Sequence, residues 1–361
     1  LDEFLERRKK IDDELKKLND ISVQTKSNHK DFSHDEAIEI QKRFKTVYDQ
    51  YVKYGEIGDA VLQNRVLKTI FDKIVFRIIP ESSTRLAELQ TGAIDIMSHL
   101  EVSQAKTLDK SNFFEVKSAT SPTVNVLRFD TTKAPVDDVK VRQAINYAID
   151  KNAIIDDILD GYGKAVSSFQ SELSFGYNKD LKPYEYDPEK AKQLLSEANV
   201  KEGTSIDLYI PGNSAQTKEV AEAVSYYLEQ VGLKLNIKTV ESNTLQNDLI
   251  PKGNAGQMYS FGWGGWTLDF DNTAYLLYHK GEFWNPDLDD PQIEQMLEKE
   301  RSTVDQDERK AVFDDLTQYL HDQAVEVDLY QTEALFGVNK RVEGFEPPHD
   351  DRLDLTNVTV K

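Results

Sequence analysis

Apolar residues recur along the chain with two different periods, and this pattern predicts a mixed α/β protein. Runs rich in β-branched and aromatic residues at 74–79, 123–129 and 205–210 predict strands. Amphipathic stretches predict helices, among them 139–159 and 217–231. Strands that alternate with helices are typical of α/β folds with mixed sheets. The other predicted elements are strands at 94–97, 233–240, 326–330 and 334–338 and helices at 82–89, 188–198, 291–301 and 305–324.

Residues 1–60 follow a different pattern from the rest of the chain. Residues 1–19 have the pattern of a charge-dense helix. Ser33 and Glu36 form a capping-box signature that opens a second predicted helix, which ends near Tyr54. A helical hairpin and a coiled-coil face for a partner both fit this pattern, and the heptads are too few to decide between them.

The stretch 258–272 carries the densest chemistry in the sequence. A short apolar run is followed by two tryptophans, Trp263 and Trp266, and by two acids, Asp269 and Asp271. Indole faces beside carboxylates are suited to hold an organic cation, such as the amino terminus of a peptide. A hairpin with a half-buried tryptophan is the alternative on residue chemistry alone. Asp271 is better explained as a turn or cap residue of the short helix that follows.

The composition narrows the classes of function. Of the 361 residues, 39% are hydrophobic, which is enough for a sizeable core. The formal net charge of −20 argues against binding of nucleic acid, whose phosphates would be repelled, and against adsorption to an anionic membrane. The chain contains no cysteine, which excludes a disulfide, a thiolate metal site and a cysteine nucleophile.

Targeting and catalytic motifs are missing from the sequence. No run of about 18 apolar residues is present, so we expect no membrane-spanning helix. There is no signal peptide, and we expect that a leader or an anchoring cysteine was removed or not included. The motifs of serine hydrolases, zinc proteases, P-loops and dinucleotide-binding folds do not occur. We therefore expect no enzymatic activity and no cofactor.

Residues 134–151, with the sequence APVDDVKVRQAINYAIDK, resemble the signature of the family 5 extracellular solute-binding proteins. This family comprises the dipeptide, oligopeptide, glutathione and nickel receptors of ABC importers. The resemblance runs from about Phe71 to Lys361. Further landmarks of the family follow one another in order at 74–97, 186–195, 229–235 and 262–269.

The resemblance implies a two-lobed, periplasmic-binding-protein-like α/β fold of class II (cluster C), with mixed sheets and a hinge. Residues 71–125 are then expected to form part of lobe I, 126–325 lobe II, and 326–361 the return of the chain to lobe I. Residues 1–70 depart from the family, because they read as an atypical helical segment. We therefore expect lobe I to be incomplete at the N-terminus.

The resemblance also implies a function without catalysis. We expect a receptor that captures short peptides, or a related small solute such as glutathione or nickel, for the permease subunits of an ABC importer. The expected location is extracytoplasmic, as a cell-surface lipoprotein or a periplasmic protein, with membrane contact only through a lipid anchor. The alternative is an interaction scaffold that uses its N-terminal helices and carries a degenerate binding domain. A peptide pool should raise the melting temperature of a receptor but not of a scaffold.

In peptide receptors of this family, an aspartate soon after the Gly-Trp pair binds the α-ammonium of the ligand, and Asp269 occupies that place. Trp263 and Trp266 are expected to line the cleft beside it. Asn125 and Arg128 lie on the strand that crosses between the lobes. Asn125 is expected to bind the backbone of the ligand, and Arg128 is expected to bind a carboxylate of the ligand. The alternative is that these residues are exposed strand residues or form a salt bridge at the hinge.

Met97, Ser98 and His99 follow the end of a predicted strand, which is a usual place for ligand contacts in an open α/β sheet. We therefore include all three among the expected ligand-binding residues. His99 has no second histidine at helical spacing, so we expect no metal site there.

Overall fold

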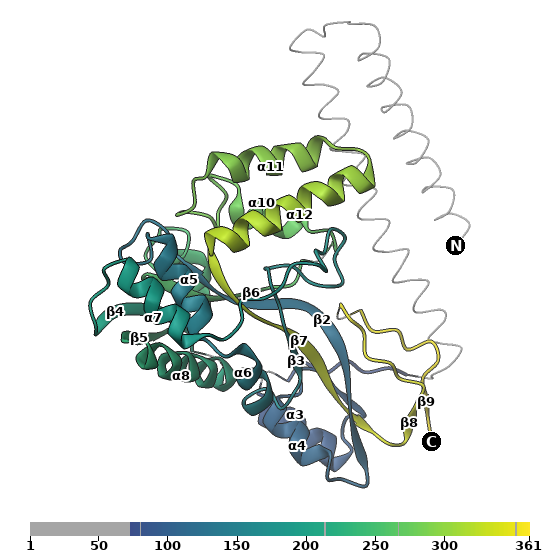
Figure 1. Cartoon of the computed structure of the whole chain (residues 1–361). Helices are drawn as coiled ribbons and strands as arrows, with labels where there is room; N and C mark the ends of the chain where they lie inside the picture. The colour runs from purple at the N-terminus through teal and green to yellow at the C-terminus, as the bar shows by residue number, and fades with distance from the viewer. Residues whose placement is uncertain (1–72, 80, 213, 266, 351) are drawn as a thin grey trace, which may run out of the picture. The chain divides into compact units, whose positions relative to one another are not determined.

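The computed structural model describes residues 73–361 except 80, 213, 266 and 351 (Figure 1). The helices predicted within residues 1–60 and the contact predicted for Trp266 lie outside the described residues. The chain divides into two compact units. The larger unit comprises Ile79–Arg341 and Glu346–Leu353, and the smaller one comprises Leu1–Ile78, Val342–Phe345 and Asp354–Lys361.

Seven strands in the described part of the larger unit form one mixed sheet. The strand order is β1-β7-β2-β6-β4-β5, and β3 pairs with β7. The sheet is antiparallel from β1 to β6, whereas β4 runs parallel to both β5 and β6. The strands are β1 Ile96–Met97, β2 Phe114–Phe129, β3 Gly163–Ala165, β4 Thr204–Pro211, β5 Leu233–Val240, β6 Met258–Trp263 and β7 Glu326–Asn339.

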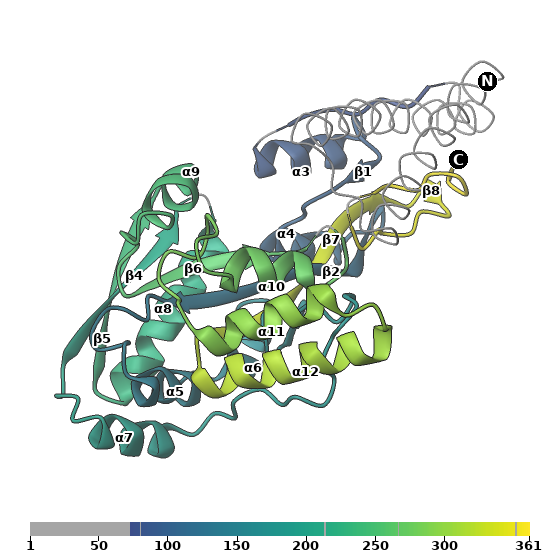
Figure 2. The same cartoon turned by 90° about the horizontal axis from the view of Figure 1, so that it is seen from above.

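The helices cover both faces of this sheet (Figures 1 and 2). Helices α5 to α8 pack on one face, and α10 to α12 pack on the other. A turn of π-helix at Leu245–Leu249 follows α9. The helices are α3 Ser82–Thr91, α4 Val102–Leu108, α5 Val139–Ala148, α6 Lys151–Asp157, α7 Pro188–Glu197, α8 Ala215–Gln230, α9 Ser242–Thr244, α10 Asp271–Tyr278, α11 Pro291–Ser302 and α12 Gln306–Gln323.

Strands β2 and β7 are long partners that connect three hydrophobic clusters. At one end, Phe114 and Leu335 pack with the helices α3 and α4. Towards the other end, Leu127 and Val327 belong to the cluster beneath α5 to α8, whereas Val126 belongs to the cluster beneath α10 to α12. Successive residues of a strand point to opposite faces, so β2 contributes apolar side chains to both of these clusters.

Several predicted elements differ from the structure, and the two clearest differences concern a helix and a strand. The helix predicted at 139–159 is two helices, because Ile149 is extended and the side chain of Asp150 caps α6 by accepting the Ala153 N–H. The strand predicted at 74–79 is wrong, since the described residues of this segment belong to no strand and expose Phe76 and Ile78. β-branched content alone forms no strand without a neighbour that pairs with its backbone.

The described part of the smaller unit contains one two-stranded ladder. Strand β8, Val342–Glu343, pairs antiparallel with β9, Thr359–Val360. Phe345 and Val358 are buried beside it.

Candidate functional site

An open cavity lies where the ladder between β2 and β7 is interrupted. Thr120 pairs with Glu333 and Val124 with Gln331, so residues 121–123 stand opposite a single residue of β7. Such bulges bend a strand and are frequent beside functional sites. The cavity has a volume of about 310 Å³, at the lower end of the range of ligand pockets. Its lining residues are Ser121, Pro122, Thr123, Trp263, Gly264, Gly265, Ala334, His349, Asp350 and Arg352.

Trp263 forms the aromatic wall of this open cavity. It is the last residue of β6 and pairs with Val124 of β2. Its indole lies nearly parallel to the ring of Phe261, with centroids 6.4 Å apart, and 5.2 Å from the ring of Trp284. Its Nε1 is buried without a hydrogen-bond partner among the described residues. Neighbouring rings therefore fix the orientation of the indole before any ligand enters.

Two glycines let the chain turn directly behind this wall. A Cβ atom on Gly264 would lie 3.1 Å from the Oγ1 atom of Thr123, so a larger residue would require the Thr123 side chain to shift. Gly265 has a φ of +57°, a backbone conformation that favours glycine. The glycines thus keep the turn close to the bulge of β2.

The opposite rim of the open cavity is polar, and sequence reasoning missed it. The Nδ1 atom of His349 lies 2.8 Å from the carbonyl oxygen of Thr120. Asp350 and Arg352 form an ion pair of 3.4 Å, in which the arginine side chain is largely exposed. No motif marks these residues, and only the return of the chain after β7 brings them to the cavity.

Asp269 does not line the open cavity. Both of its carboxylate oxygens accept hydrogen bonds from Arg309, at 2.7 and 2.8 Å, and Arg309 also donates to Glu300 at 2.9 Å. Asp269 Oδ1 further accepts the Asp271 N–H at 3.0 Å, so Asp269 supports the start of α10. Asp271 is the first residue of that helix and binds Arg301. The role of Asp269 in binding an ammonium stays a prediction, and Arg309 would compete with that ligand.

Asn125 and Arg128 lie on opposite faces of β2. The side chain of Asn125 lies over Gly262, on which a Cβ atom would be 3.0 Å from Asn125 Oδ1, and it lines a cavity of about 20 Å³ beneath α8. Arg128 is only 2% exposed and lies 3.7 Å from Glu326. Its nearest carboxylate is therefore an internal one. The predicted ligand contacts of both residues are untested, and neither residue lines the open cavity.

Met97, Ser98 and His99 lie far from Trp263. Met97 is buried and pairs with Gly337, six residues along β7 from the Gln331 that pairs with Val124. This separation is roughly 20 Å along the strand. His99 is exposed, and the described residues contain no cluster of three side chains that could hold a metal ion. The structure does not bring these three residues to the open cavity.

The model of the bacterial extracellular solute-binding proteins, family 5 (middle part), matches residues 31–285. The chain belongs to this family. The match begins before Phe71, so the family 5 likeness includes residues that sequence reasoning assigned to an atypical segment.

Curated relatives in family 5 agree with this assignment. Heme-binding protein A of Haemophilus influenzae is 30% identical over 290 residues, which are 77% of this chain and 52% of the relative. The dipeptide-binding protein of Escherichia coli is 30% identical over 306 residues, which are 81% of this chain and 56% of the relative. The chain thus spans about half the length of the curated relatives it matches.

Solved structures confirm the predicted fold class. The periplasmic binding protein DppA from Helicobacter pylori, in complex with the peptide STSA, is 25% identical with a TM-score of 0.70, over 79% of this chain and 56% of that one. A Pseudoalteromonas dipeptide-binding protein in complex with Met-Leu is 25% identical with a TM-score of 0.69, over 79% of this chain and 57% of that one. The boundaries of the lobes stay a prediction.

Family 5 consists of extracellular binding proteins rather than enzymes, which supports an extracytoplasmic location. Within the described residues, no helix has both the length and the apolar character needed to cross a membrane.

Proposed function

We propose that this chain is a solute-binding receptor that captures short peptides for an ABC importer, with the open cavity beside Trp263 as the ligand seat. The observation that carries this proposal is a 310 Å³ cavity, walled by a fixed indole, at the bulge of β2. Membership of family 5 and the likeness to peptide-bound structures support peptide as the solute.

The cavity offers two kinds of contact to a short peptide. The indole of Trp263 provides an apolar face against which a ligand side chain loses contact with water. Asp350 and Arg352 on the rim carry opposite charges, which match the ammonium and carboxylate ends of a zwitterionic peptide. Because Arg352 is largely exposed and Asp350 is partly exposed, this rim pair contributes little to folding and can re-pair with a ligand.

In this proposal, no covalent bond forms or breaks when the ligand is captured. The cluster around α3 and α4 is separate from the two clusters beneath α5 to α12, and β2 and β7 join them. We propose that the first cluster belongs to lobe I and the other two to lobe II, with the division near residues 125 and 326. Bending of β2 and β7 would then close the lobes over the ligand.

Permease subunits of the importer are the proposed partners, and attachment as a lipoprotein is the proposed link to a membrane. The relatives give no support to the alternative of an interaction scaffold.

The test is a peptide pool offered to the full chain. Native mass spectrometry should find one bound di- to tetrapeptide per chain, and a ligand at 100 times its Kd should stabilise the fold by about 2.7 kcal/mol. Acetylated and amidated peptides are the matched control and should bind more weakly. No bound peptide and an unchanged melting temperature across the pool would contradict the proposal.

A further inference from the structure

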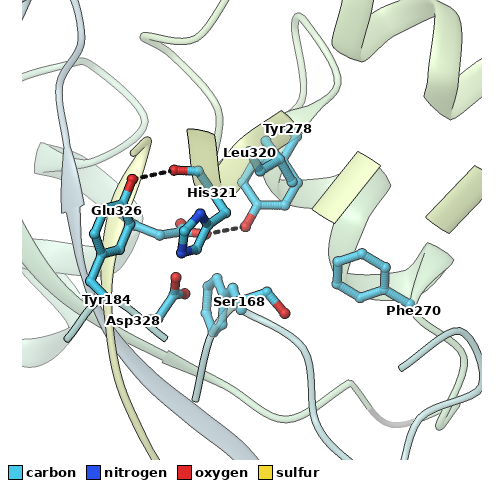
Figure 3. A pocket seen from close by; sticks show the side chains of 9 residues that line it. Ser168, Tyr184, Phe270, Tyr278, Leu320, His321, Glu326 and Asp328 are labelled. Atoms are coloured by element: carbon cyan, nitrogen blue, oxygen red, sulfur yellow. Dashed lines mark hydrogen bonds between the residues drawn. The ribbon is translucent and has the colours of Figure 1, made fainter. Parts of the chain in front are cut away.

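A second, enclosed chamber lies between the start of β7 and the helices α10 and α12 (Figure 3). Its volume is about 10 Å³, close to the minimum that admits one water molecule. The proposed function gives no role to the ionisable groups of this chamber. It is lined by Ser168, Phe169, Tyr184, Phe270, Tyr278, Leu320, His321, Glu326 and Asp328.

Two carboxylates of β7 face this chamber from alternate positions. Glu326 is 4% exposed and Asp328 is 5% exposed. Val327 and Leu329, which alternate with them, belong to the core on the opposite face of the sheet. The Oε2 atom of Glu326 and the Oδ1 atom of Asp328 have no hydrogen-bond partner in the described structure. Each acid therefore has an oxygen that lacks a donor, and an uncompensated polar atom in a dry site is unfavourable.

Glu326 has two partners from other elements. The Tyr278 hydroxyl of α10 donates a hydrogen bond to its Oε1 atom, as Figure 3 shows. The Nε atom of Arg128, on β2, lies 3.7 Å from its Oε2 atom. Arg128 also donates to the carbonyl of Leu277 at 2.8 Å, so these contacts attach the end of α10 to the sheet.

Asp328 faces groups of three further segments. The ammonium of Lys151, the first residue of α6, is buried without a hydrogen-bond partner and lies 5.9 Å above the ring of Tyr184. Tyr184 stacks on His321 at 4.2 Å and donates a hydrogen bond of 2.7 Å to its carbonyl. On its outer side, His321 Nδ1 lies 3.6 Å from Asp322. The chamber thus connects α6, α12 and β7.

The charges around the chamber do not balance. Asp287, which is 6% exposed and has two carboxylate oxygens without a partner, is a third acid near Arg128. Glu326, Asp328 and Asp287 oppose the two cations Arg128 and Lys151. One negative charge is therefore in excess when all five groups are ionised.

The remaining neighbours do not remove this excess. Asp130 also lies near Asp287, but it is paired with Lys133 at 2.7 Å. Burial raises the pKa of Tyr184, Tyr259 and Tyr278, so all three stay protonated and neutral around pH 7. Burial also lowers the pKa of His321, which keeps it neutral at that pH.

We propose that the enclosed chamber is a proton-binding site, in which Glu326 and Asp328 share one proton when α10 and α12 are docked on β7. Two carboxylates that face one dry site cannot both remain ionised at low cost, because their charges repel. Binding of the proton removes the excess charge and gives one acid an O–H donor. The docked state should therefore become more stable as the solution is acidified from pH 8 to pH 6.5.

The pKa of Asp328 gives the direction of this effect, and two neighbouring groups oppose it in part. Burial, together with the neighbouring Glu326, raises the pKa of Asp328 well above its usual value, so the folded state binds a proton more tightly than the unfolded state. Lys151 opposes the effect near pH 8, because burial lowers its pKa to about 8 and the folded state there holds less of this proton than the unfolded state. Well below that pH, Lys151 is charged in both states. His321 also opposes the effect as the pH falls through about 6.5, because burial lowers its pKa and the unfolded state then gains more of this proton than the folded state.

The test compares the full wild-type chain with the D328N variant. Asn has the shape of a protonated aspartic acid and carries no charge. We expect the wild type to gain at least about 2 °C in Tm between pH 8 and pH 6.5. We expect D328N to melt above the wild type at pH 8 and to lack this gain. Hydrogen exchange should show the added protection in residues 316–328 and not in α3 or α4.

Asp314, which pairs with Lys310 on the exposed side of α12, provides the matched control, because D314N should keep the pH dependence of the wild type. If D328N melts below the wild type at pH 8 and keeps the gain on acidification, Asp328 acts as the ionised partner of Lys151, and the proton-binding proposal is overturned. An unchanged wild-type Tm between pH 8 and pH 6.5 would overturn it too.

Discussion

The open cavity and the enclosed chamber use the same pair of strands in opposite ways. Ser121–Thr123 and Ala334 line the open cavity, whereas Arg128 and Glu326 meet beside the enclosed chamber, roughly 17 Å beyond Thr123 along β2. In the open cavity, the fixed element is an uncharged indole, and the charges lie on an exposed rim. In the enclosed chamber, the charges themselves are buried and held by the fold.

This difference shows which charges are available to a ligand. An exposed ion pair contributes about 0–1 kcal/mol to folding, so it can re-pair at little cost. A buried pair cannot lose one partner without leaving a desolvated charge, which costs several kcal/mol. Arg128 therefore belongs to the framework of the fold, and Asp350 and Arg352 are better placed to meet a solute.

The largest expected effect is the loss of the buried cation. Substitution R128Q should destabilise the chain by about 3–5 kcal/mol, because Glu326 loses its buried cationic partner and the carbonyl of Leu277 loses a donor. Chemical denaturation monitored by circular dichroism measures this change. R341Q, which removes an exposed arginine paired with Asp95, is the matched control and should change stability by about 1 kcal/mol or less. If R128Q and R341Q destabilise the chain equally, the distinction between buried and exposed charges is wrong.

A smaller effect, with a defined pH dependence, is expected for Asp287. Burial raises its pKa to about 6 in the folded protein, so the folded state binds its proton more tightly than the unfolded state. The stability that comes from this proton is fully present below about pH 4 and is lost as the pH rises through 6.

Substitution D287N should therefore stabilise the chain at pH 7.5, by up to roughly 3 kcal/mol, and the gain should disappear near pH 4. Urea titrations at both pH values measure it. D289N alters an exposed acid nearby and should produce no such gain. Destabilisation of D287N at pH 7.5 would mean that Arg128 requires this carboxylate in its ionised form.

The smallest of these effects concerns Asp269. Substitution D269N removes the carboxylate charge that binds Arg309, and we expect a loss of roughly 1–2 kcal/mol of stability, because the pair is partly exposed. The affinity for a peptide with a free amino terminus should change less than about threefold. The comparison requires thermal melts and calorimetric titrations of the same variant. A large loss of affinity with unchanged stability would restore the predicted ammonium contact.

Local sequence signals predicted much of the fold. Most helices and strands of the larger unit, including α7, which begins at Pro188 as predicted, follow from local periodicity. The continuity of β7 was not predicted. A polar run between residues 326–330 and 334–338 led to a prediction of two separate strands. That run stays in the strand because β2 and β3 pair with it.

The site was predicted only in part, for a related reason. Trp263 was found because its glycines and aromatic neighbours are adjacent in sequence. Arg128 was expected to bind a ligand, and its partner Glu326 stands 198 residues away in sequence but directly opposite in the β2–β7 register. His349 and Asp350 reach the open cavity only through the path of the chain after β7. Such pairings arise from tertiary structure and leave no local pattern.

The most direct test of the central claim is a calorimetric titration of the wild type and of W263A with the tightest-binding peptide of the pool. If the open cavity holds the solute, W263A should raise the Kd at least about 30-fold, since the loss of an aromatic anchor costs about 2 kcal/mol or more. The Kd of W263F should lie between those of the wild type and W263A. Y226A, which removes an exposed ring on α8, should have the Kd of the wild type. A folded W263A variant with the Kd of the wild type would contradict the claim.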